Sequence, residues 1–259
     1  MISYIKFYIN NCFFLLLTFL ISLFKTFSQK NIDSLISFPM VSANYMVQLP
    51  LADMSKNYGI NNNIGTSLIY KTKNNVFFEI NYNFIFGNKL KGDALKIFDS
   101  ITTSDGNIIN EHGEYAKVIT SERGYFVGLK IGLNTFKIKN PNSGILFKLG
   151  FGLFQHKINI ENDGNNAPQI LGEYKYGYDK MRYGPCFSQA IAFIYFSKSQ
   201  IINFCLGIEF YEAFTKSGRA YDFNLRKKDN NNYLDILSSI MFSWIIPFYK
   251  KSANETYYY

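Results

Sequence analysis

The stretch VFFEINYNFIFG, residues 76–87, decides the fold because its side chains alternate in character along its whole length. Its apolar positions are Val76, Phe78, Ile80, Tyr82, Phe84 and Phe86. The positions between them are Phe77, Glu79, Asn81, Asn83, Ile85 and Gly87. Because successive side chains of a β-strand point to opposite faces, this pattern predicts a strand with one oily face and one mostly polar face.

The same two-sided pattern recurs seven more times along the chain. The further oily faces run from Val41 to Leu49, Ile64 to Tyr70, Tyr125 to Leu133, Ile145 to Leu153, Phe187 to Tyr195, Ile202 to Phe210 and Leu234 to Ile246. Gln189 and Ile194 break the alternation in the sixth strand. Tilted strands of about ten residues rise roughly 25 Å, the height of an outer-membrane apolar band. The sequence therefore predicts an all-β fold, an eight-stranded antiparallel up-and-down transmembrane β-barrel.

The lengths of the connections support this topology, since outer-membrane barrels alternate short periplasmic turns with longer outer loops. The expected short connections are 73–74, 137–143 and 199–200, and the longer ones are 51–61, 88–122, 163–184 and 217–232. An even number of strands then places both mature termini on the periplasmic side. Within 88–122, the sequence Ser104-Asp105-Gly106-Asn107 predicts a tight turn with Gly106 at positive φ.

The N-terminus predicts export from the cytoplasm. Lys6 precedes an apolar run from Cys12 to Phe24, and Thr26-Phe27-Ser28 offers small residues for a signal peptidase. We expect a cleaved signal peptide at 1–28, a barrel domain at 29–250 and a periplasmic tail at 251–259, which predicts an outer-membrane location. The alternative is an uncleaved anchor helix, although the clean apolar stretch falls below the ~20 residues that span a bilayer.

A soluble periplasmic barrel or sandwich is the structural rival, with its oily face turned inward. Residue size favours the membrane barrel, because the oily faces carry large side chains while the opposite faces are rich in Gly, Ala, Ser and Asn.

Composition excludes several classes of function. Loss of residues 1–28 removes two lysines and no acidic residue, which lowers the formal net charge from +8 to +6. Basic residues are dispersed, so nucleic acid is not an expected partner. With only two histidines we expect no metal site and no cofactor. Cys186 and Cys205 lie on separate strands at different heights and should be free thiols.

Several segments resemble the small outer-membrane barrels common in Bacteroidota, which are related in architecture to OmpA-like, opacity-type and PorT-like proteins. The resemblance rests on segments 48–59, 63–65, 70–73, 84–89, 103–110 and 141–146, and it covers roughly residues 37–250. It implies the barrel fold and supplies no catalytic residues. The tail Ser252–Tyr259 departs from the usual ending at the last strand. Either Tyr257–Tyr259 or Trp244–Phe248 could therefore be the aromatic signal for the barrel-insertion machinery.

Four ionisable residues should point into the lumen at membrane depth: Glu79, Lys130, Lys148 and Glu209. Two negative and two positive charges can form a neutral network, and an unpaired charge there would be costly. The plain interpretation is a structural plug. The sharper hypothesis is a gate that opens when the pairs exchange partners.

Basic residues on the long connections form the other candidate site. These residues are Lys89, Lys91, Lys96, Lys175, Lys180, Arg182, Arg219, Arg226, Lys227 and Lys228. Facing outward, they could pair with lipopolysaccharide phosphates, or they could be dispersed solubilising charge.

The leading functional hypothesis is a non-enzymatic outer-membrane protein with a structural or interaction role among envelope components, in contact with outer-membrane lipid, lipopolysaccharide and possible envelope protein partners. A PorT-like accessory barrel of a secretion or assembly machine is the first alternative, and it rests on the resemblance alone. The second is a lipid-modifying enzyme or small-solute carrier. For that enzyme, His112 and His156 are the available general bases, with Ser188 and Glu209 as conceivable neighbours of His156.

Overall fold

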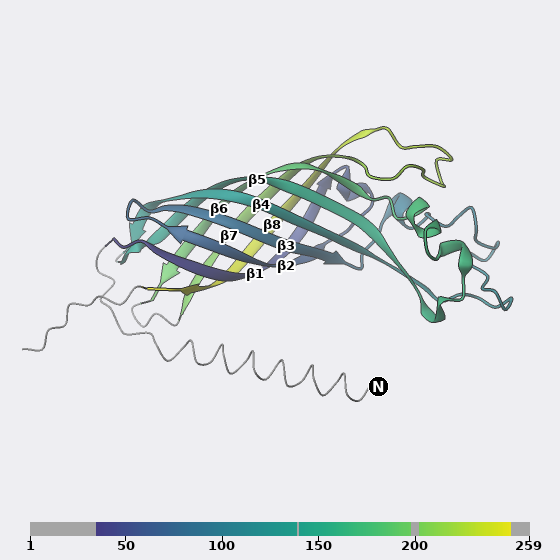
Figure 1. Cartoon of the computed structure of the whole chain (residues 1–259), viewed down its shortest axis with the longest axis horizontal. Helices are drawn as coiled ribbons and strands as arrows, with labels where there is room; N and C mark the ends of the chain where they lie inside the picture. Colours follow the sequence, from purple (N-terminus) through teal and green to yellow (C-terminus); the bar gives the residue numbers. More distant parts are fainter. Residues whose placement is uncertain (1–34, 139, 198–201, 250–259) are drawn as a thin grey trace, which may run out of the picture. The chain divides into compact units, whose positions relative to one another are not determined.

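The protein is an antiparallel barrel of eight strands, described by a computed structural model that covers residues 35–138, 140–197 and 202–249 (Figure 1). The strands are β1 (Phe38–Ala52), β2 (Asn61–Lys71), β3 (Val76–Gly87), β4 (Val118–Ile138), β5 (Asn140–Asn162), β6 (Arg182–Phe196), β7 (Asn203–Ser217) and β8 (Asn232–Pro247). Each strand pairs with its neighbour in the chain, and β1 pairs with β8 to close the ring. The predicted fold class is confirmed, while the expected signal peptide and tail lie outside the described residues.

Short 3-10 helices lie only in the connections within the described ranges. They are η1 (Met54–Lys56), η2 (Gly92–Ala94), η3 (Asp163–Asn165), η4 (Pro168–Ile170) and η5 (Tyr174–Gly177). No helix in this part of the chain has the length and apolar character needed to cross a bilayer. Connections 53–60, 88–117, 163–181 and 218–231 gather at one end of the barrel, which we name the loop end. The opposite end, where β3 follows β2 through 72–75, is the turn end.

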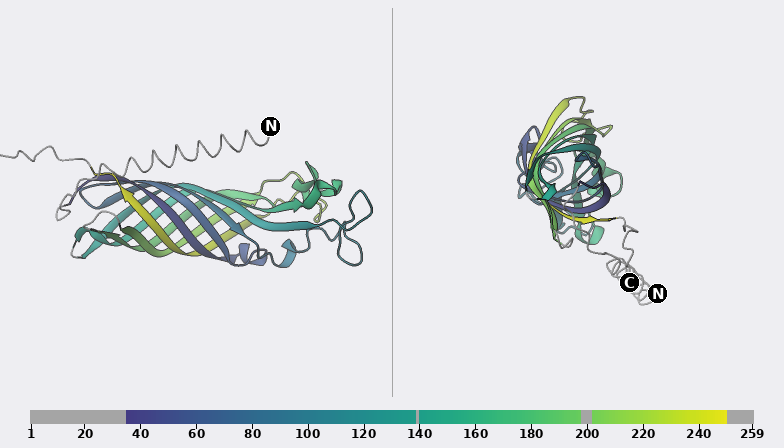
Figure 2. Two further views of the ribbon diagram at one scale, coloured as in Figure 1. Left: turned by 90° about the horizontal axis from the view of Figure 1, so that it is seen from below. Right: turned by 90° about the vertical axis from the view of Figure 1, so that its left-hand side faces the viewer.

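The strand register fixes the width of the barrel. A row of paired residues leaves β1 at Phe38 and returns to β1 at Gln48, ten residues further on. The row runs through Lys71, Phe77, Gly132, Lys148, Ala190, Glu209 and Ser239. This stagger implies strands tilted by about 40°, and the strands wind around the ring accordingly (Figure 2). An eight-stranded barrel is just wide enough inside for side chains to fill it.

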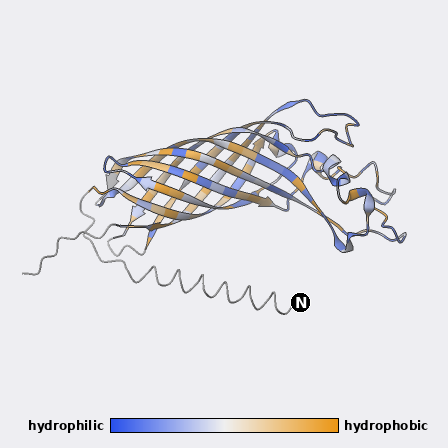
Figure 3. Cartoon of the chain, in the orientation of Figure 1, coloured by the Kyte–Doolittle hydropathy of each residue, from blue (hydrophilic) through white to orange (hydrophobic). Residues whose placement is uncertain are grey.

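The oily faces of the strands point outward, as the sequence predicts. The exposed fraction is 63% for Leu129, 63% for Leu149 and 65% for Ile240. Exposed apolar side chains occur on all eight strands, and the ribbon in Figure 3 shows hydrophobic and hydrophilic residues alternating along the strands. Both predicted breaks in β6 are present, since Gln189 is exposed and Ile194 is buried. The rival arrangement, with the oily face turned inward, is therefore wrong.

The β4–β5 hairpin extends beyond the rim of the barrel. β4 begins at Val118 and not after residue 122, so the predicted loop 88–122 is shorter than expected. The last β3–β4 pair is Gly87 with Glu122, while β4 and β5 stay paired as far as Val118 and Asn162. On this ribbon the long loops build a small hydrophobic core of their own. Its members are Ile108, Ala167, Ile170 and Tyr178, with Phe98, Val118, Ile160 and Phe223 packed against them.

Two local predictions are also confirmed. Gly106 has a φ of 78°, and the turn around it is closed by hydrogen bonds between the backbones of Thr103 and Asn107 and of Gly106 and Thr103. Cys186 and Cys205 are both buried free thiols.

Glycines on β4 and β5 make room in the lumen for large side chains. Gly128 and Gly152 are paired across the two strands, and the buried ring of Phe126 lies against them. A Cβ at position 152 would clash with the carbonyl oxygen of Val127 and would lie 2.7 Å from Cα of Gly128 and 2.9 Å from the Phe126 ring. The lumen is thus packed by pairing large residues with glycines.

We predict that Gly152→Leu overpacks the lumen and destabilises the barrel by about 1–3 kcal/mol, since neither backbone nor ring can yield. Urea unfolding in detergent micelles, followed by Trp244 fluorescence, measures the change. Leu149→Ile on the outer wall is the control and should leave the free energy of unfolding nearly unchanged. Equal stability of the two variants would contradict the tight packing at Gly152.

Candidate functional site

The charged core of the lumen consists of two separate ion pairs. Lys148 Nζ donates to Glu79 Oε2 at 2.8 Å, and Lys130 Nζ donates to Glu209 Oε1. All four side chains are at least 93% buried. Each charge has an opposite charge in hydrogen-bond contact, which offsets the cost of removing it from water.

A chain of neutral hydrogen bonds supports Glu79 from the side of β1 and β2. The Ser67 hydroxyl donates to Glu79 Oε1 at 2.9 Å, and the Asn44 amide donates to Ser67 Oγ at 2.8 Å. Ser42 in turn donates to Asn44 Oδ1 at 2.9 Å. The carboxylate of Glu79 therefore accepts from a lysine on one side and a hydroxyl on the other.

The two ion pairs cross the lumen and do not join the residues that are direct neighbours on adjacent strands. Glu79 and Lys130 are direct neighbours on β3 and β4, yet Lys130 reaches across to Glu209 on β7. Gly150 permits this crossing, because a Cβ there would clash with Ser188 Oγ and lie 2.6 Å from Cγ of Lys130. The missing side chain at Gly150 on β5 thus leaves the space through which the Lys130 side chain extends to Glu209.

Aromatic and apolar side chains close the lumen on both sides of the ion pairs. Toward the loop end, the rings of Phe126 and Tyr211 meet edge to face at 5.0 Å, and Lys130 Nζ lies 5.4 Å from the centre of the Tyr211 ring. Toward the turn end, Phe38 and Phe196 meet at 5.5 Å. Further buried apolar residues fill that end: Met40, Ile69, Phe77, Leu146, Ile194 and Ile245.

A very small cavity lies beside the Glu79–Lys148 pair. Its volume is about 10 Å³, and Ser42, Cys205 and Ser243 line it together with apolar residues. A space of this size holds about one water molecule.

A second charged cluster lies in the lumen near the loop end. His156 Nε2 is 3.0 Å from Asp235 Oδ2, and the Thr215 hydroxyl donates to the same oxygen. Arg182 Nη1 lies 3.5 Å from Asp235 Oδ1, and its guanidinium stacks on Tyr233 at 3.4 Å from the ring centre. Asp235 is thus the hub of this cluster.

The expectation for Arg182 was wrong. It was assigned to an outward loop, but it is the first residue of β6, faces the lumen and is 8% exposed. The neighbours considered for His156 were also wrong, since the described residues pair it with Asp235 and not with Ser188 or Glu209. The Thr215 hydroxyl donates to the same aspartate oxygen and not to the imidazole.

Four further buried charges of the described residues do not belong to the expected lumen network: Lys71, Glu122, Asp179 and Asp235. The strand period places Asp235 and Lys71 opposite the oily faces of their strands, which is where the structure has them, although neither was counted in the expected network. Glu122 was assigned to a loop, and it lies on β4, where the Asn61 amide donates to both of its oxygens at 2.9 and 3.0 Å. Lys71 donates to the carbonyl oxygens of Ile36 and Thr72 at the turn end.

The first loop folds over the mouth of the barrel. Met54 and Tyr58 are buried, and the Tyr58 ring packs against His156 with ring centres 5.3 Å apart. Backbone hydrogen bonds tie this loop to residues 89–91 and to Leu234 on β8. Asp53 accepts from Lys56 and from the Leu234 N–H, and these hydrogen bonds hold the pKa of its carboxyl below the usual value.

The remaining basic loop residues divide into those that contact a polar or aromatic partner and those that are exposed. Arg219 makes a bidentate pair with Asp179 and stacks on Tyr176, and Lys180 donates to the carbonyl of Asp93 at 3.4 Å. Lys175 is half-buried beside the Tyr176 ring. The exposed ones are Lys89, Lys91, Lys96, Arg226, Lys227 and Lys228. His112 is exposed beside Glu111, and no cluster of metal-binding side chains occurs in the described part of the chain.

The chain matches no protein-family model and no curated protein. Among solved structures it is similar to Neisserial surface protein A, with 12% identity, a TM-score of 0.46 and coverage of 81% of this chain and 97% of that one. It is also similar to the attachment invasion locus protein Ail of Yersinia pestis, with 8% identity, a TM-score of 0.45 and coverage of 82% and 99%. The outer membrane protein OprG of Pseudomonas aeruginosa has 10% identity and a TM-score of 0.35, with coverage of 85% and 100%.

We predict that Lys130→Met destabilises the barrel by about 3–5 kcal/mol, because it leaves the Glu209 carboxylate buried and unpaired. Adding Glu209→Gln should recover most of that loss. Urea unfolding of the two single variants and the double variant gives the coupling energy. Independent, additive effects would mean that the two side chains do not stabilise each other in the lumen.

Proposed function

We propose that this chain is a closed, non-enzymatic barrel of the outer membrane, with a structural or interaction role exercised through its loops. One observation carries the proposal: large apolar side chains form most of the outer wall, while four ionisable residues at mid-height are packed inside as ion pairs, Glu79 with Lys148 and Lys130 with Glu209. A wall of this kind is stable when acyl chains surround it. In water, so large an apolar surface would be an aggregation hazard.

The packed lumen supports a barrel that does not conduct. Ion pairs, the Phe126 and Tyr211 rings and the apolar residues at the turn end occupy successive levels of the interior. The first loop covers the mouth. Opening a path would require breaking a buried ion pair and moving several large side chains, so the plug is favoured over the gate.

The exposed charges of the last loop favour contact with anionic groups at the cell surface. Arg226, Lys227 and Lys228 are consecutive, exposed and lie beyond the tip of β7 and β8. Phosphates of lipopolysaccharide are the polyanion that such a loop would meet outside the membrane. The loop end would then face the outside of the cell, and the N- and C-terminal ends of the chain would both lie on the periplasmic side. A role as a PorT-like accessory barrel rests on the sequence resemblance alone.

The membrane location is tested with two leucines of similar exposure. Leu129 lies on the outer wall at 63% exposure, and Leu95 lies in loop 88–117 at 65%. In a membrane barrel Leu129→Arg should cost about 2–4 kcal/mol, since the charge enters hydrocarbon. Leu95→Arg should change stability by less than about 0.5 kcal/mol. Unfolding in lipid vesicles measures both, and two silent substitutions would argue for a soluble barrel.

Planar-bilayer recordings test whether the lumen conducts. We expect no steady conductance from the wild-type protein or from Lys130→Ala, because the apolar side chains at the turn end block the lumen independently of the Lys130–Glu209 pair. A porin recorded in the same bilayers serves as the positive control. Channels that open in Lys130→Ala alone would support the gate hypothesis.

A further inference from the structure

Two polar side chains lie on the outer wall among exposed apolar residues. Gln189 on β6 is exposed, and its amide donates to Glu212 Oε1 on β7 at 3.2 Å. Exposed apolar residues flank the pair along both strands: Phe187 and Ile191 on β6, and Phe210 and Phe214 on β7. Ser238 on β8 is level with Gln189 across Phe210 and also faces outward.

This pair is costly where it lies. Within the described residues, Gln189 is the side chain that Glu212 bonds to, so further acceptor positions of the carboxylate and the Gln189 carbonyl face the surroundings. Acyl chains offer no hydrogen bonds, and polar groups on a lipid-facing wall are therefore rare and usually have a role. What the pair lacks is a donor, an N–H or an O–H, supplied from outside the barrel.

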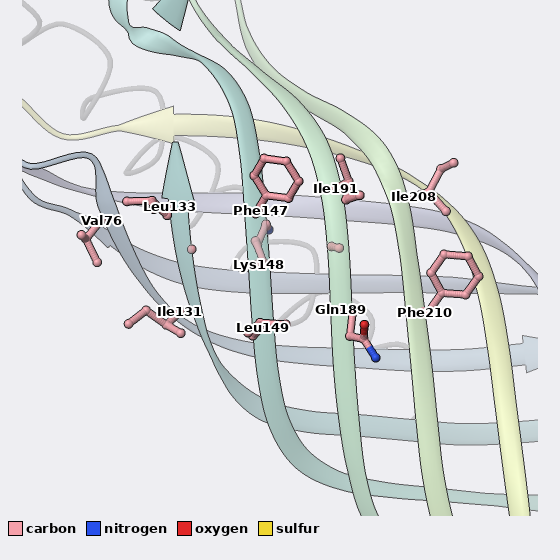
Figure 4. A pocket seen from close by; sticks show the side chains of 12 residues that line it. Val76, Ile131, Leu133, Phe147, Lys148, Leu149, Gln189, Ile191, Ile208 and Phe210 are labelled. Atoms are coloured by element: carbon pink, nitrogen blue, oxygen red, sulfur yellow. The ribbon is translucent and has the colours of Figure 1, made fainter. Parts of the chain in front are cut away.

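An apolar groove crosses the outer wall from β7 to β3, and Gln189 is one of its lining residues (Figure 4). Its volume is about 860 Å³, and Gln189 is the polar side chain that projects into it from the outer face. The apolar lining includes Ile131, Phe147, Leu149, Ile191, Ile208 and Phe210. Lys148, whose position borders the groove, turns its ammonium to the other side of the wall, where it pairs with Glu79.

The order of chemistry along the wall matches an amphiphile of the outer leaflet. The groove offers an apolar surface at the level of acyl chains, and the Gln189–Glu212 pair offers acceptors above it. Further toward the loop end, Lys216 is exposed on the outer face of β7, beside Tyr183. This ammonium can pair with an anionic headgroup.

We infer that this wall binds a lipid that carries N–H or O–H donors where its chains join the headgroup, with a chain in the groove and the donors on Glu212 and Gln189. An amide-linked or hydroxylated acyl lipid has these donors, and an ester-linked lipid lacks them. The inference rests on the proposed function, because it requires a lipid-facing wall.

A second groove, which reaches β4 from the side of β1 and β2, provides the internal control. It has a volume of about 550 Å³ and is lined by apolar residues of β1 to β4, including Leu68, Phe78 and Leu129. Its two charged lining residues, Glu79 and Lys130, point into the lumen and are paired there. It therefore offers an acyl chain a smaller apolar surface, in which the Tyr70 hydroxyl is the outward polar group and neither an amide nor a carboxylate of the lining points outward.

The test uses tryptophan as a local reporter, since Trp244 is the one tryptophan of the sequence. Ile191→Trp reports on the first groove and Leu68→Trp on the second, each made together with Trp244→Phe. The proteins are reconstituted in vesicles of brominated phosphatidylcholine, which quenches the tryptophan. Unbrominated sphingomyelin or phosphatidylcholine is then added. These two lipids share a headgroup, but only sphingomyelin has amide and hydroxyl donors at the chain junction.

At Ile191→Trp we expect sphingomyelin to relieve quenching with a relative affinity about threefold to tenfold above that of phosphatidylcholine, the effect of one or two hydrogen bonds inside a bilayer. At Leu68→Trp the two lipids should relieve quenching with the same relative affinity. Gln189→Leu with Glu212→Leu should abolish the preference. These substitutions extend the apolar wall, so folding should survive, and the heat-dependent gel shift of folded barrels checks it.

The remaining outcomes separate the two proposals. If neither tryptophan is quenched by brominated lipid, the membrane-spanning proposal itself fails. If both are quenched and sphingomyelin has no advantage at Ile191→Trp, only the lipid site fails. A preference that survives the double leucine variant also overturns it. Quenching at Leu68→Trp but not at Ile191→Trp would mean that a protein, such as a second copy of this chain, covers the groove.

Discussion

Closing eight strands with a stagger of ten residues leaves an interior that only side chains can fill, so each inward polar group needs its partner inside the barrel. The two buried lysines at mid-height satisfy this constraint by pairing with Glu79 and Glu209. Glycines at 150 and 152 satisfy it sterically, because they leave space for the Lys130 stem and for the Phe126 ring. Charge pairing and packing are thus one problem in this lumen, and the solution leaves room for about one water beside Lys148.

The outer wall obeys the opposite requirement, since it has to present apolar surface on every strand. Against that background the Gln189–Glu212 pair stands out more than any charge in the lumen. Lumen charges have partners supplied by the fold, whereas this pair has acceptors that the barrel does not satisfy. The chemistry most in need of explanation is therefore on the wall that faces lipid, beside an apolar groove, and not in the interior where charges were first expected to matter.

Loops at the rim add a third layer that strand periodicity does not describe. The β4–β5 ribbon carries an apolar core of its own, and the Tyr58 ring covers His156 at the mouth. Arg182 belongs to this region for a simple reason: β6 begins three residues earlier than expected, and that start places the side chain inside, next to Asp235. Moving a strand end by three residues changes which alternating positions belong to the barrel, and loop residues have no period that would reveal it.

The sequence by itself determined the strands, their number, their closing order and the side of each that faces outward, including the irregular positions Gln189 and Ile194. It could do so because alternation is a property of consecutive residues and survives in the folded chain unchanged. Tertiary structure alone decided that Lys130 pairs with Glu209 and not with its neighbour Glu79, that Asp235 holds His156, and that Gln189 meets Glu212 at the head of a groove. Those contacts join residues on different strands, and they depend on the stagger of the closed ring and on the reach of each side chain, neither of which any short stretch of sequence contains.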